Sequence, residues 1–208
     1  MQLALAGKTE AQVYHLLTQL VVPRPIAWVL TPNRIDSAAT ELSLNLAPFS
    51  FFTPLASDPA LIGFSIGNRL SGRQKDTFRN CSVIGSPLVV HIAGAHQSAD
   101  VQASAQHLAY AETELDLLDS ADLSSDWDFE IPRLRDCPVA FGAHVYRIVE
   151  IVPPSQQVLV IAKIEAIDVL SGAVKINAET GRTSIDPFLL DPVSRLGAGT
   201  FAGLRPII

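Results

Sequence analysis

The chain has 208 residues, of which 48% are hydrophobic and 17% are charged, and its formal net charge at pH 7 is −6. This charge excludes a general attraction to nucleic acid or to an anionic membrane surface, and no run of about 18 apolar residues is present to cross a bilayer. The length fits a single sizeable core, so we treat residues 1–208 as one domain.

The N-terminal segment and the cysteines indicate the compartment. Residues 1–10, MQLALAGKTE, are too short and too poor in positive charge to form a secretory signal. Without such a signal, Cys81 and Cys137 are expected to be reduced and buried, and their separation matches no metal or redox motif. The histidines also lack metal-ligand spacing, so we predict a cytoplasmic protein and assign no metal.

The first predicted element is an amphipathic helix that begins after Thr9. Thr9 and Gln12 have the spacing of a capping box, in which each side chain bonds the backbone N–H of the other residue. Apolar residues then repeat at helical spacing on one face, at Val13, Leu16, Leu17 and Leu20. Pro23 and Pro25 end the helix.

Runs typical of β-strands make up most of the remaining chain. Extended segments are predicted at residues 25–31, 43–52, 60–67, 87–94, 139–152 and 157–170. Turn-like residues separate several of them, as at 32–42 and at Ser57-Asp58-Pro59. This pattern favours a closed or partly closed antiparallel barrel with peripheral helices.

Further helices are few. A short helix is predicted from about residue 76 to 82, with Asp76 or Thr77 as its N-cap, and another helix is predicted at 98–109. The acidic segment 111–130 is interpreted as a partly helical surface excursion. The last stretch, 171–208, is rich in glycine and is expected to be mostly loop.

Several stretches occur in an order that resembles one family. They are RPIAWVLT (24–31), NLAPFSFF (45–52), DPALIGFSIG (58–67), KDTFRN (75–80), VVHI (89–92), IPRLRDCPVAFGAHVYRIVEI (131–151), VLVIAKIEAIDV (158–169) and PVSRLGAGTFAGL (192–204). On these stretches the chain resembles the flavin reductase-like, FMN-binding split-barrel family, which has flavoredoxin-like members. The combination of NLAPFSFF with KDTxxN makes the resemblance specific.

The resemblance implies a fold, a cofactor and an assembly. The expected fold is mainly β, a six-stranded antiparallel Greek-key split barrel with peripheral α-helices. The expected assembly is a homodimer, with FMN bound near the subunit interface. The family includes NAD(P)H-dependent flavin reductases that supply reduced flavin to monooxygenases, and it also includes electron-transfer flavoproteins.

One group of residues is expected to bind the FMN phosphate. Lys75 precedes the predicted helix, where its amine can reach a dianion, and Thr77 can donate its hydroxyl hydrogen. Arg73 can make a bidentate contact, Asn80 can reach the ribityl chain or the phosphate, and Ser65 is a further candidate. The alternative is ordinary solvated surface. The resemblance favours the ligand for Lys75 and Thr77 and leaves both interpretations open for Arg73.

A second group is expected to face the flavin ring. Pro48 has no N–H and marks an edge or a break, which leaves the backbone groups of Ala47 and Phe49 available to the ring. Asn45 and Ser50 supply polar side chains. For Phe49 ordinary core packing is the favoured alternative, whereas for Asn45 and Ser50 the ligand is favoured.

Three further residues complete the candidates. Arg195 and Phe201 lie in SRLGAGTF, where the family has an arginine and an aromatic residue near the flavin or the partner chain. The alternative for both is the packing of a C-terminal loop. His91, in an apolar strand, is interpreted as a satisfied core histidine and not as a catalytic one. No catalytic residue is assigned.

The chain departs from the family pattern at three places. The loop 32–44 is longer than usual and has no glycine, which puts the access of nicotinamide in question. Ala162 and Lys163 replace a common Gly-Glu pair, and Phe201 replaces a tyrosine and so lacks its hydroxyl.

The sequence therefore supports one leading hypothesis and two alternatives. The first is an FMN-binding oxidoreductase of the flavin reductase type, which passes electrons from NAD(P)H through FMN to free flavin or another acceptor and has a monooxygenase or a redox protein as partner. The second is a flavoredoxin-like electron-transfer flavoprotein that is reduced by a protein donor. The third is a non-catalytic flavin-binding barrel.

Overall fold

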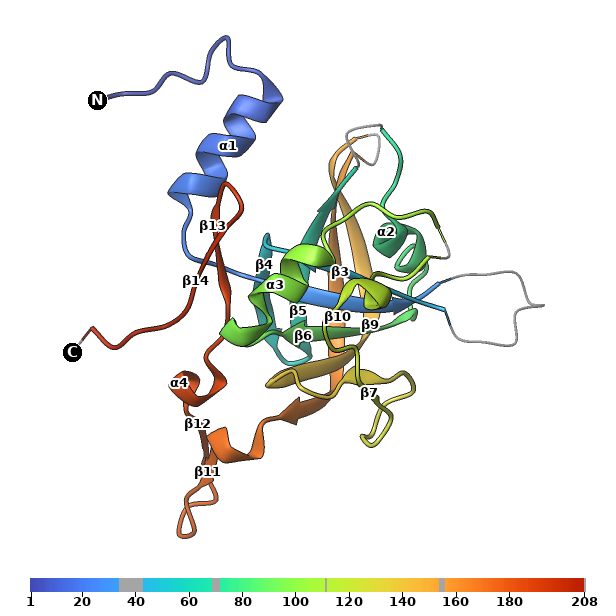
Figure 1. Ribbon diagram of the computed structural model, residues 1–208, viewed down its shortest axis with the longest axis vertical. Helices are drawn as coiled ribbons and strands as arrows, with labels where there is room; N and C mark the ends of the chain where they lie inside the picture. Colours follow the sequence, from blue (N-terminus) through green and yellow to red (C-terminus); the bar gives the residue numbers. More distant parts are fainter. Residues whose placement is uncertain (34–42, 69–71, 111, 154–155, 208) are drawn as a thin grey trace.

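The computed structural model describes residues 1–33, 43–68, 72–110, 112–153 and 156–207. Within these ranges the main element is an antiparallel sheet of seven strands in the order β3-β2-β6-β9-β10-β5-β4 (Figure 1). Its strands are β2 (Ala27–Pro32), β3 (Leu44–Phe49), β4 (Phe52–Ser57), β5 (Ala60–Gly67), β6 (Pro87–Ile92), β9 (Val139–Val152) and β10 (Gln157–Val169). The prediction of a mainly β fold with a large antiparallel sheet is confirmed.

The described part of the sheet has one strand more than the resemblance implies. The predicted run 43–52 breaks at Ser50 and Phe51, and the chain continues as the separate edge strand β4. Pro54 argues against a strand here, but an edge strand tolerates proline, and the β4–β5 ladder has a register shift just after it. The expected count of six strands is therefore not confirmed, because the described residues form seven.

The two edges of the sheet are adjacent in the chain. β3 and β4 lie at opposite ends of the strand order, yet only Ser50 and Phe51 separate them in sequence. The sheet therefore curls until its edges meet. At this corner the Phe51 carbonyl accepts a hydrogen bond from the Ser65 N–H of β5 at 2.8 Å. The curled sheet therefore has the shape of a barrel whose edge strands β3 and β4 are joined at the corner, with no ladder between them among the described residues.

Strand β2 is buried on both faces. Because side chains alternate across a strand, Ala27 and Val29 enter the core inside the barrel, where they join Phe64 and residues of the other strands. Trp28 and Leu30 point the other way, into a second core. This double burial accounts for the nearly continuous apolar run in the sequence at this point.

His91 lies in β6 and is completely buried. Its Nε2 accepts the Leu134 N–H at 2.9 Å, so the ring hydrogen lies on Nδ1, which donates to the Trp28 carbonyl at 3.1 Å. Burial lowers the pKa of His91 to about 4, because it disfavours the charged form; the bond to Trp28 opposes this effect and the positive charge of Arg133 adds to it. The interpretation of His91 as a satisfied core histidine is confirmed.

Cys81 and Cys137 are both buried free thiols, as predicted. Burial raises the pKa of Cys137 to about 12, so this thiol stays protonated and unreactive at neutral pH. Among the residues that the structure describes, no group of three or more His, Cys, Asp or Glu is arranged to hold a metal ion.

The helices beside the barrel are shorter than predicted. α2 (Asp76–Asn80) ends before residue 82, and its N-cap is Lys75, not Asp76 or Thr77. α3 (Ser98–Ala103) ends well before residue 109. Ser104, the residue directly after the helix, is buried and accepts a hydrogen bond from the Trp28 indole at 2.8 Å. No helix within the described ranges is long and apolar enough to cross a membrane.

The acidic segment contains little regular structure, in line with its interpretation as a partly helical excursion. The short elements around it are η1 (Ala95–Gln97), η2 (Glu114–Leu117), β7 (Leu123–Ser124) and β8 (Arg133–Leu134).

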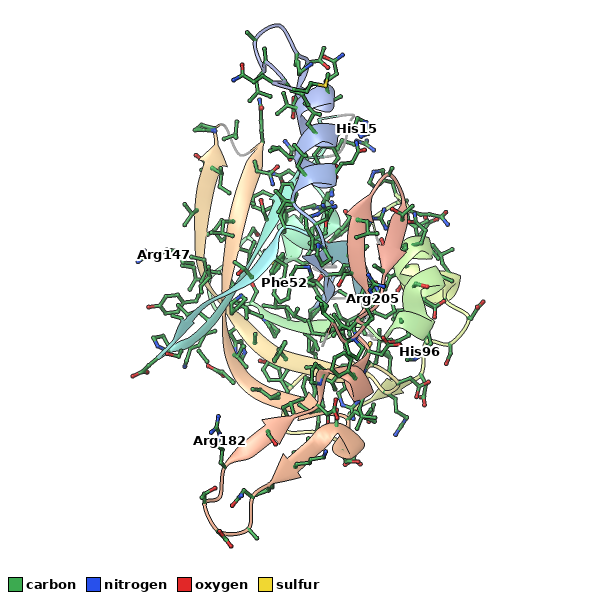
Figure 2. The ribbon with its side chains drawn as sticks, turned by 90° about the vertical axis from the view of Figure 1, so that its left-hand side faces the viewer. His15, Phe52, His96, Arg147, Arg182 and Arg205 are labelled. Carbon is green, nitrogen blue, oxygen red and sulfur yellow. The ribbon has the colours of Figure 1, made fainter. Side chains whose placement is uncertain are left out.

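Two elements project from opposite ends of the barrel (Figure 2). One is α1 (Glu10–Leu20), which has the predicted capping box: the Thr9 N–H donates to Gln12 Oε1 at 2.9 Å, and the Gln12 N–H donates to Thr9 Oγ1 at 3.3 Å. The other is the hairpin of β11 (Val174–Ile176) and β12 (Thr183–Ile185).

The C-terminal stretch is not mostly loop, and that prediction is wrong. Besides β11 and β12 it forms η3 (Ser171–Ala173), α4 (Pro187–Leu190), β13 (Ser194–Gly197) and β14 (Thr200–Ala202), and β13 pairs with β1 (Arg24–Pro25). Gly197 and Gly199 have φ of 105° and 79° at the turn between β13 and β14. Since such angles favour glycine, these glycines shape a hairpin.

Candidate functional site

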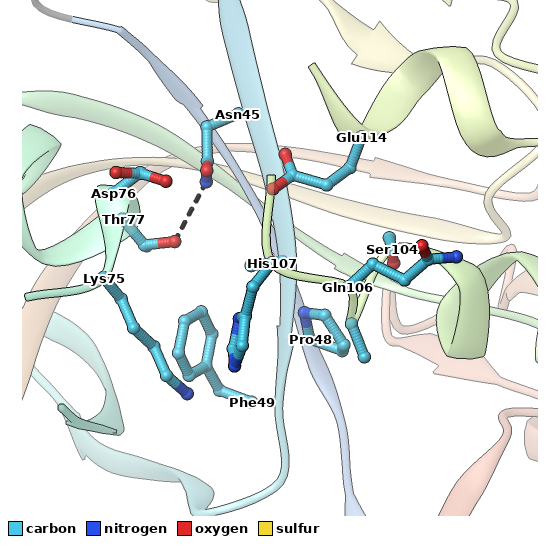
Figure 3. A pocket seen from close by; sticks show the side chains of 12 residues that line it. Asn45, Pro48, Phe49, Lys75, Asp76, Thr77, Ser104, Gln106, His107 and Glu114 are labelled. Atoms are coloured by element: carbon cyan, nitrogen blue, oxygen red, sulfur yellow. Dashed lines mark hydrogen bonds between the residues drawn. The ribbon is translucent and has the colours of Figure 1, made fainter. Parts of the chain in front are cut away.

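A cavity of about 90 Å³ lies beside the edge strand β3, where the two sequence motifs meet (Figure 3). It is lined by β3, by the start of α2, and by the chain that follows α3 together with η2. Six of the predicted site residues line it, namely Asn45, Ala47, Pro48, Phe49, Lys75 and Thr77.

One hydrogen bond joins the motifs. Asn45 Nδ2 donates to Thr77 Oγ1 at 3.0 Å, and the two side chains are only 3% and 1% exposed. Because Thr77 Oγ1 is the acceptor in this bond, its own hydrogen is not used by it. β3 and α2 are thus held together at the cavity by a buried polar contact, and the two stretches that were far apart in sequence form one wall.

Lys75 supplies a cation to this wall. It caps α2 with an extended backbone, and its Nζ lies 5.3 Å from the centroid of the Phe49 ring. A cation over an aromatic face is favourable, so Phe49 helps to keep the amine at the cavity. The Phe49 ring also packs on Phe64 at 5.5 Å in the barrel core, which agrees with the core-packing interpretation of this residue.

Six lining residues were not predicted: Asp76, Ser104, Ala105, Gln106, His107 and Glu114. Residues 104–107 were placed in a helix that in fact ends at Ala103. Glu114 belongs to the segment interpreted as a surface excursion, but it is 4% exposed, and its Oε2 accepts the Leu46 N–H of β3 at 2.9 Å. In the sequence, the one local indication of a turn at Glu114 is the capping residue Thr113, whose Oγ1 accepts the Leu115 N–H.

Ser50, Ser65 and Asn80 were predicted but do not line the cavity. Ser50 Oγ accepts a hydrogen bond from Arg24 Nε at 3.3 Å, and Ser65 Oγ accepts one from Gln157 Nε2. Asn80 is 3% exposed and donates from Nδ2 to Thr31 Oγ1 and to Asn33 Oδ1, each at 2.9 Å. These three side chains therefore form hydrogen bonds with other residues of the protein and do not line the cavity.

Arg24, which holds Ser50, also connects α1 to the barrel. Its guanidinium is buried and donates to the carbonyls of Thr18 and Val21 at the end of α1, the latter at 2.7 Å. Basic groups stabilise a helix C-terminus, because they satisfy its unpaired carbonyls. The end of α1 and the Ser50 corner of the barrel are therefore fixed to one side chain.

Arg73, Arg195 and Phe201 also lie outside the cavity lining. Arg73 is exposed. The Arg195 guanidinium lies over the Phe201 ring at 4.5 Å and donates to Gln102 Oε1 at 3.0 Å. Burial lowers the pKa of Arg195 from its usual value, although the group remains charged at neutral pH. This pair packs against α3, close in sequence to Ser104 of the cavity.

A larger cavity of about 590 Å³ lies elsewhere, near the end of β10 and beside α4. It contains none of the predicted site residues. Two of its charged side chains, Arg133 and Asp168, form an ion pair at 3.0 Å. We therefore place the candidate site at the smaller cavity, where the motifs converge.

Residues 19–182 match the model of the flavin reductase like domain. The chain belongs to the flavin reductase-like family. An uncharacterized protein of Deinococcus radiodurans is 31% identical over 193 residues, which cover 92% of this chain and 81% of that protein.

Solved structures agree with this assignment. Nitrilotriacetate monooxygenase component B from Bacillus cereus is 27% identical, with a TM-score of 0.81 over 100% of this chain and 97% of that chain. The 2-nitrobenzoate 2-nitroreductase of Pseudomonas fluorescens is 24% identical, with a TM-score of 0.79 over 100% of this chain and 96% of that chain. The resemblance found in the sequence is confirmed.

The departures from the family pattern can now be placed. Ala162 is buried in the barrel core, and Lys163 is on the surface, where its Nζ lies 3.0 Å from Glu165 Oε1. Phe201 contributes a ring face to Arg195 where a tyrosine would add a hydroxyl. Most of the loop 32–44 lies outside the described residues.

The residues of the cavity fit one part of a flavin nucleotide. A lysine amine, a threonine hydroxyl and an asparagine amide are the groups that a phosphate or a ribityl chain requires. However, about 90 Å³ is well below the roughly 300–1,000 Å³ of ordinary small-molecule pockets. The described residues of one chain therefore surround only part of such a ligand.

Proposed function

We propose that this flavin reductase-like protein binds FMN and acts as an oxidoreductase that passes electrons from NAD(P)H through FMN to free flavin or another acceptor. The observation that carries the proposal is the buried bond between Asn45 and Thr77, which unites the two flavin-type motifs at one cavity. The family supports a flavin as the class of cofactor. The similarity to a monooxygenase component supports a monooxygenase as the partner that uses the reduced flavin.

In this proposal the two ends of the cavity have different tasks. Lys75 neutralises the phosphate and Thr77 donates a hydroxyl to it; we rely on the lysine charge, because α2 has only five residues and so a short run of aligned peptide dipoles. Ala47 and Pro48 face the ring edge, and Asn45, whose Nδ2 donates to Thr77 Oγ1, contacts the ribityl chain beside the phosphate. When bound, FMN supplies the redox chemistry, and these residues hold and orient it.

Six predicted site residues lie outside the cavity lining, and we assign them to the part of FMN that extends beyond the cavity. Ser50, Ser65 and Asn80 form hydrogen bonds to Arg24, Gln157 and Thr31, which fix the strands and the helix that carry the two motifs. Arg73 is an exposed cation that precedes Lys75 in the chain, and the ring of Phe201 positions the Arg195 guanidinium. We propose these six as outer contacts and supports of the same FMN, and Lys75 and Thr77 as its inner phosphate contacts.

We also propose a homodimer. Exposed apolar side chains occur at both ends of the described chain: on α1, Leu17 is 48% and Leu20 is 70% exposed, and at the opposite end Ile176 is 69% exposed. Burial of such side chains in an interface is favourable, and a second subunit can complete the partial cavity.

Wild-type protein should sediment as a dimer and a Leu17→Asp/Leu20→Asp variant as a monomer, whereas Ile84→Asp, at another exposed apolar site, should leave the dimer intact.

The primary test is a titration of the purified protein with FMN, followed by NADH or NADPH without oxygen and then by excess free flavin. We expect FMN to bind and to raise the unfolding temperature, because a ligand of the folded state stabilises it. We expect NAD(P)H to bleach the bound flavin and to be oxidised in excess of protein. Bound flavin that stays oxidised would indicate the electron-carrier alternative, and absence of binding would refute the cofactor assignment.

A further inference from the structure

The helix α1 packs little of its surface against the rest of the described chain. Of its 11 residues, Thr18 is the only one that is buried within the part of the chain that the structure describes. Tyr14, Leu17 and Leu20 are spaced three residues apart on one side of the helix, and they are 55%, 48% and 70% exposed. Because an isolated helix of this length is marginal in water, α1 needs an apolar surface against this side.

The hairpin of β11 and β12 also has an uncovered apolar face. Val174 and Ile185 are opposite each other in the ladder, and Ile176 lies two residues further along the same face. Ile176 is 69% and Ile185 is 42% exposed. The alternating residues Lys175 and Ser184 lie on the other face. A two-stranded hairpin is marginally stable by itself, so its apolar face also needs a cover.

The two apolar faces cannot cover each other within one chain. α1 and the hairpin project from opposite ends of the barrel, but they lie on the same side of it, the left side in Figure 1 and the side that faces the viewer in Figure 2. A second copy related by a twofold axis at this side runs in the opposite direction. Its hairpin then lies at α1 of the first copy, and its α1 lies at the hairpin of the first, so the interface is closed. A helix packed on a sheet is an ordinary pair of layers.

We propose that α1 docks with its apolar side on the β11–β12 hairpin of a second copy of the chain, and that this hairpin completes the candidate site. The inference rests on the homodimer of the proposed function and names the element that the partner supplies. Arg24 donates to Ser50 and to the carbonyls at the end of α1, and the Tyr14 ring lies 6.3 Å from the Phe51 ring. α1 is thus fixed to the corner that follows the cavity strand β3, and a hairpin docked on α1 lies beside the partial cavity.

The test is cross-linking between cysteines introduced on the two elements. Cys81 and Cys137 are buried, so a short bis-maleimide reagent should leave wild-type chains unlinked. Leu20→Cys and Ile176→Cys chains, with tags of different length, are co-expressed, and we expect the reagent to join one chain of each kind. Ile84→Cys is the matched control: Ile84 is 65% exposed, nearly as much as Ile176, but lies between α2 and β6. It should not be linked to Leu20→Cys.

A second measurement tests the contribution of the hairpin to the site. An Ile176→Asp/Ile185→Asp variant should sediment as a monomer and bind FMN about tenfold or more weakly than wild type, because a wall of the site is lost. FMN affinity equal to that of wild type would overturn the part of the hairpin in the site.

The outcomes separate this inference from the proposed function. Links only between two Leu20→Cys chains, or no link in a sample that sediments as a dimer, would overturn the docking of α1 on the hairpin and leave the homodimer standing. A monomeric wild type would overturn the homodimer and the inference with it. Failure of wild-type protein to bind FMN would overturn the cofactor assignment, while the cross-link, which needs no flavin, would still decide the docking.

Discussion

The buried His91 makes the stability of the protein dependent on pH in a defined window. In the folded chain its pKa is about 4, whereas a histidine in an unfolded chain has a pKa near 6.5. Between these values the unfolded chain binds a proton at this residue and the folded chain does not. The contribution of His91 to the folding free energy is therefore fully present above about pH 6.5, and it is lost as the pH decreases towards 4.

The magnitude follows from the difference between the two pKa values. At about 1.4 kcal/mol per pH unit, lowering the pH from 7 to 4 removes about 3 kcal/mol of folding free energy through His91 alone. The structural reason is specific. A proton on Nε2 would face the Leu134 N–H, which now donates to that atom, and the charged ring would have no solvent around it. The nearby positive charge of Arg133 acts in the same direction.

The assay is urea unfolding between pH 7 and pH 4, followed by the fluorescence of Trp28 and Trp127. A His91→Gln variant is less stable at neutral pH but lacks the titration, so its stability should fall by about 3 kcal/mol less than that of wild type over this range. His96→Gln, which removes an exposed histidine, should show the same dependence of unfolding free energy on pH as the wild type. Equal losses in wild type and His91→Gln would refute this account of His91.

Two further predictions concern the site and the barrel. Lys75→Ala should weaken FMN binding by roughly 1.5–3 kcal/mol in a fluorescence titration, because a charge-assisted contact to phosphate is lost, while the exposed Lys175→Ala should bind FMN as wild type does. Gly142→Ala should destabilise the protein by roughly 1–3 kcal/mol in urea, because an added Cβ would lie 2.6 Å from the Phe129 ring; Gly172→Ala, where nothing lies within 4 Å, should have little effect. Equal FMN affinity of the two lysine variants would contradict the phosphate site, and equal stability of the two glycine variants would contradict the packing of Phe129.

The parts of the fold that the sequence predicted well are those with strong local patterns. The long apolar strands at 139–152 and 157–170 and the capping box at Thr9 all appear where they were expected. β4 was missed because Pro54 and polar residues hide a strand that only its pairing with β5 reveals. In 171–208 the glycines were taken for loop, although at Gly197 they form a hairpin turn.

The sequence pointed only to those residues of the cavity that lie in or next to the two motifs. Asn45 and Thr77 were found because both motifs carry a family pattern, and the structure brings them to 3.0 Å. Glu114 and His107 were missed because their place at the cavity depends on how the chain returns after α3, which no local pattern encodes. The hydrogen bonds of Asn80 to Thr31 and Asn33 were likewise not foreseen, since these partners are distant in sequence.

The closure of the barrel through Ser50 and Phe51 has a consequence for local opening. Because the strand that lines the cavity and the strand that completes the sheet are joined by a single tight corner, β3 cannot detach without disturbing β4 and its ladder with β5. The amides of β3 should therefore exchange with solvent only when most of the molecule unfolds, although β3 is an edge strand. A site on such a strand keeps its geometry for as long as the protein remains folded.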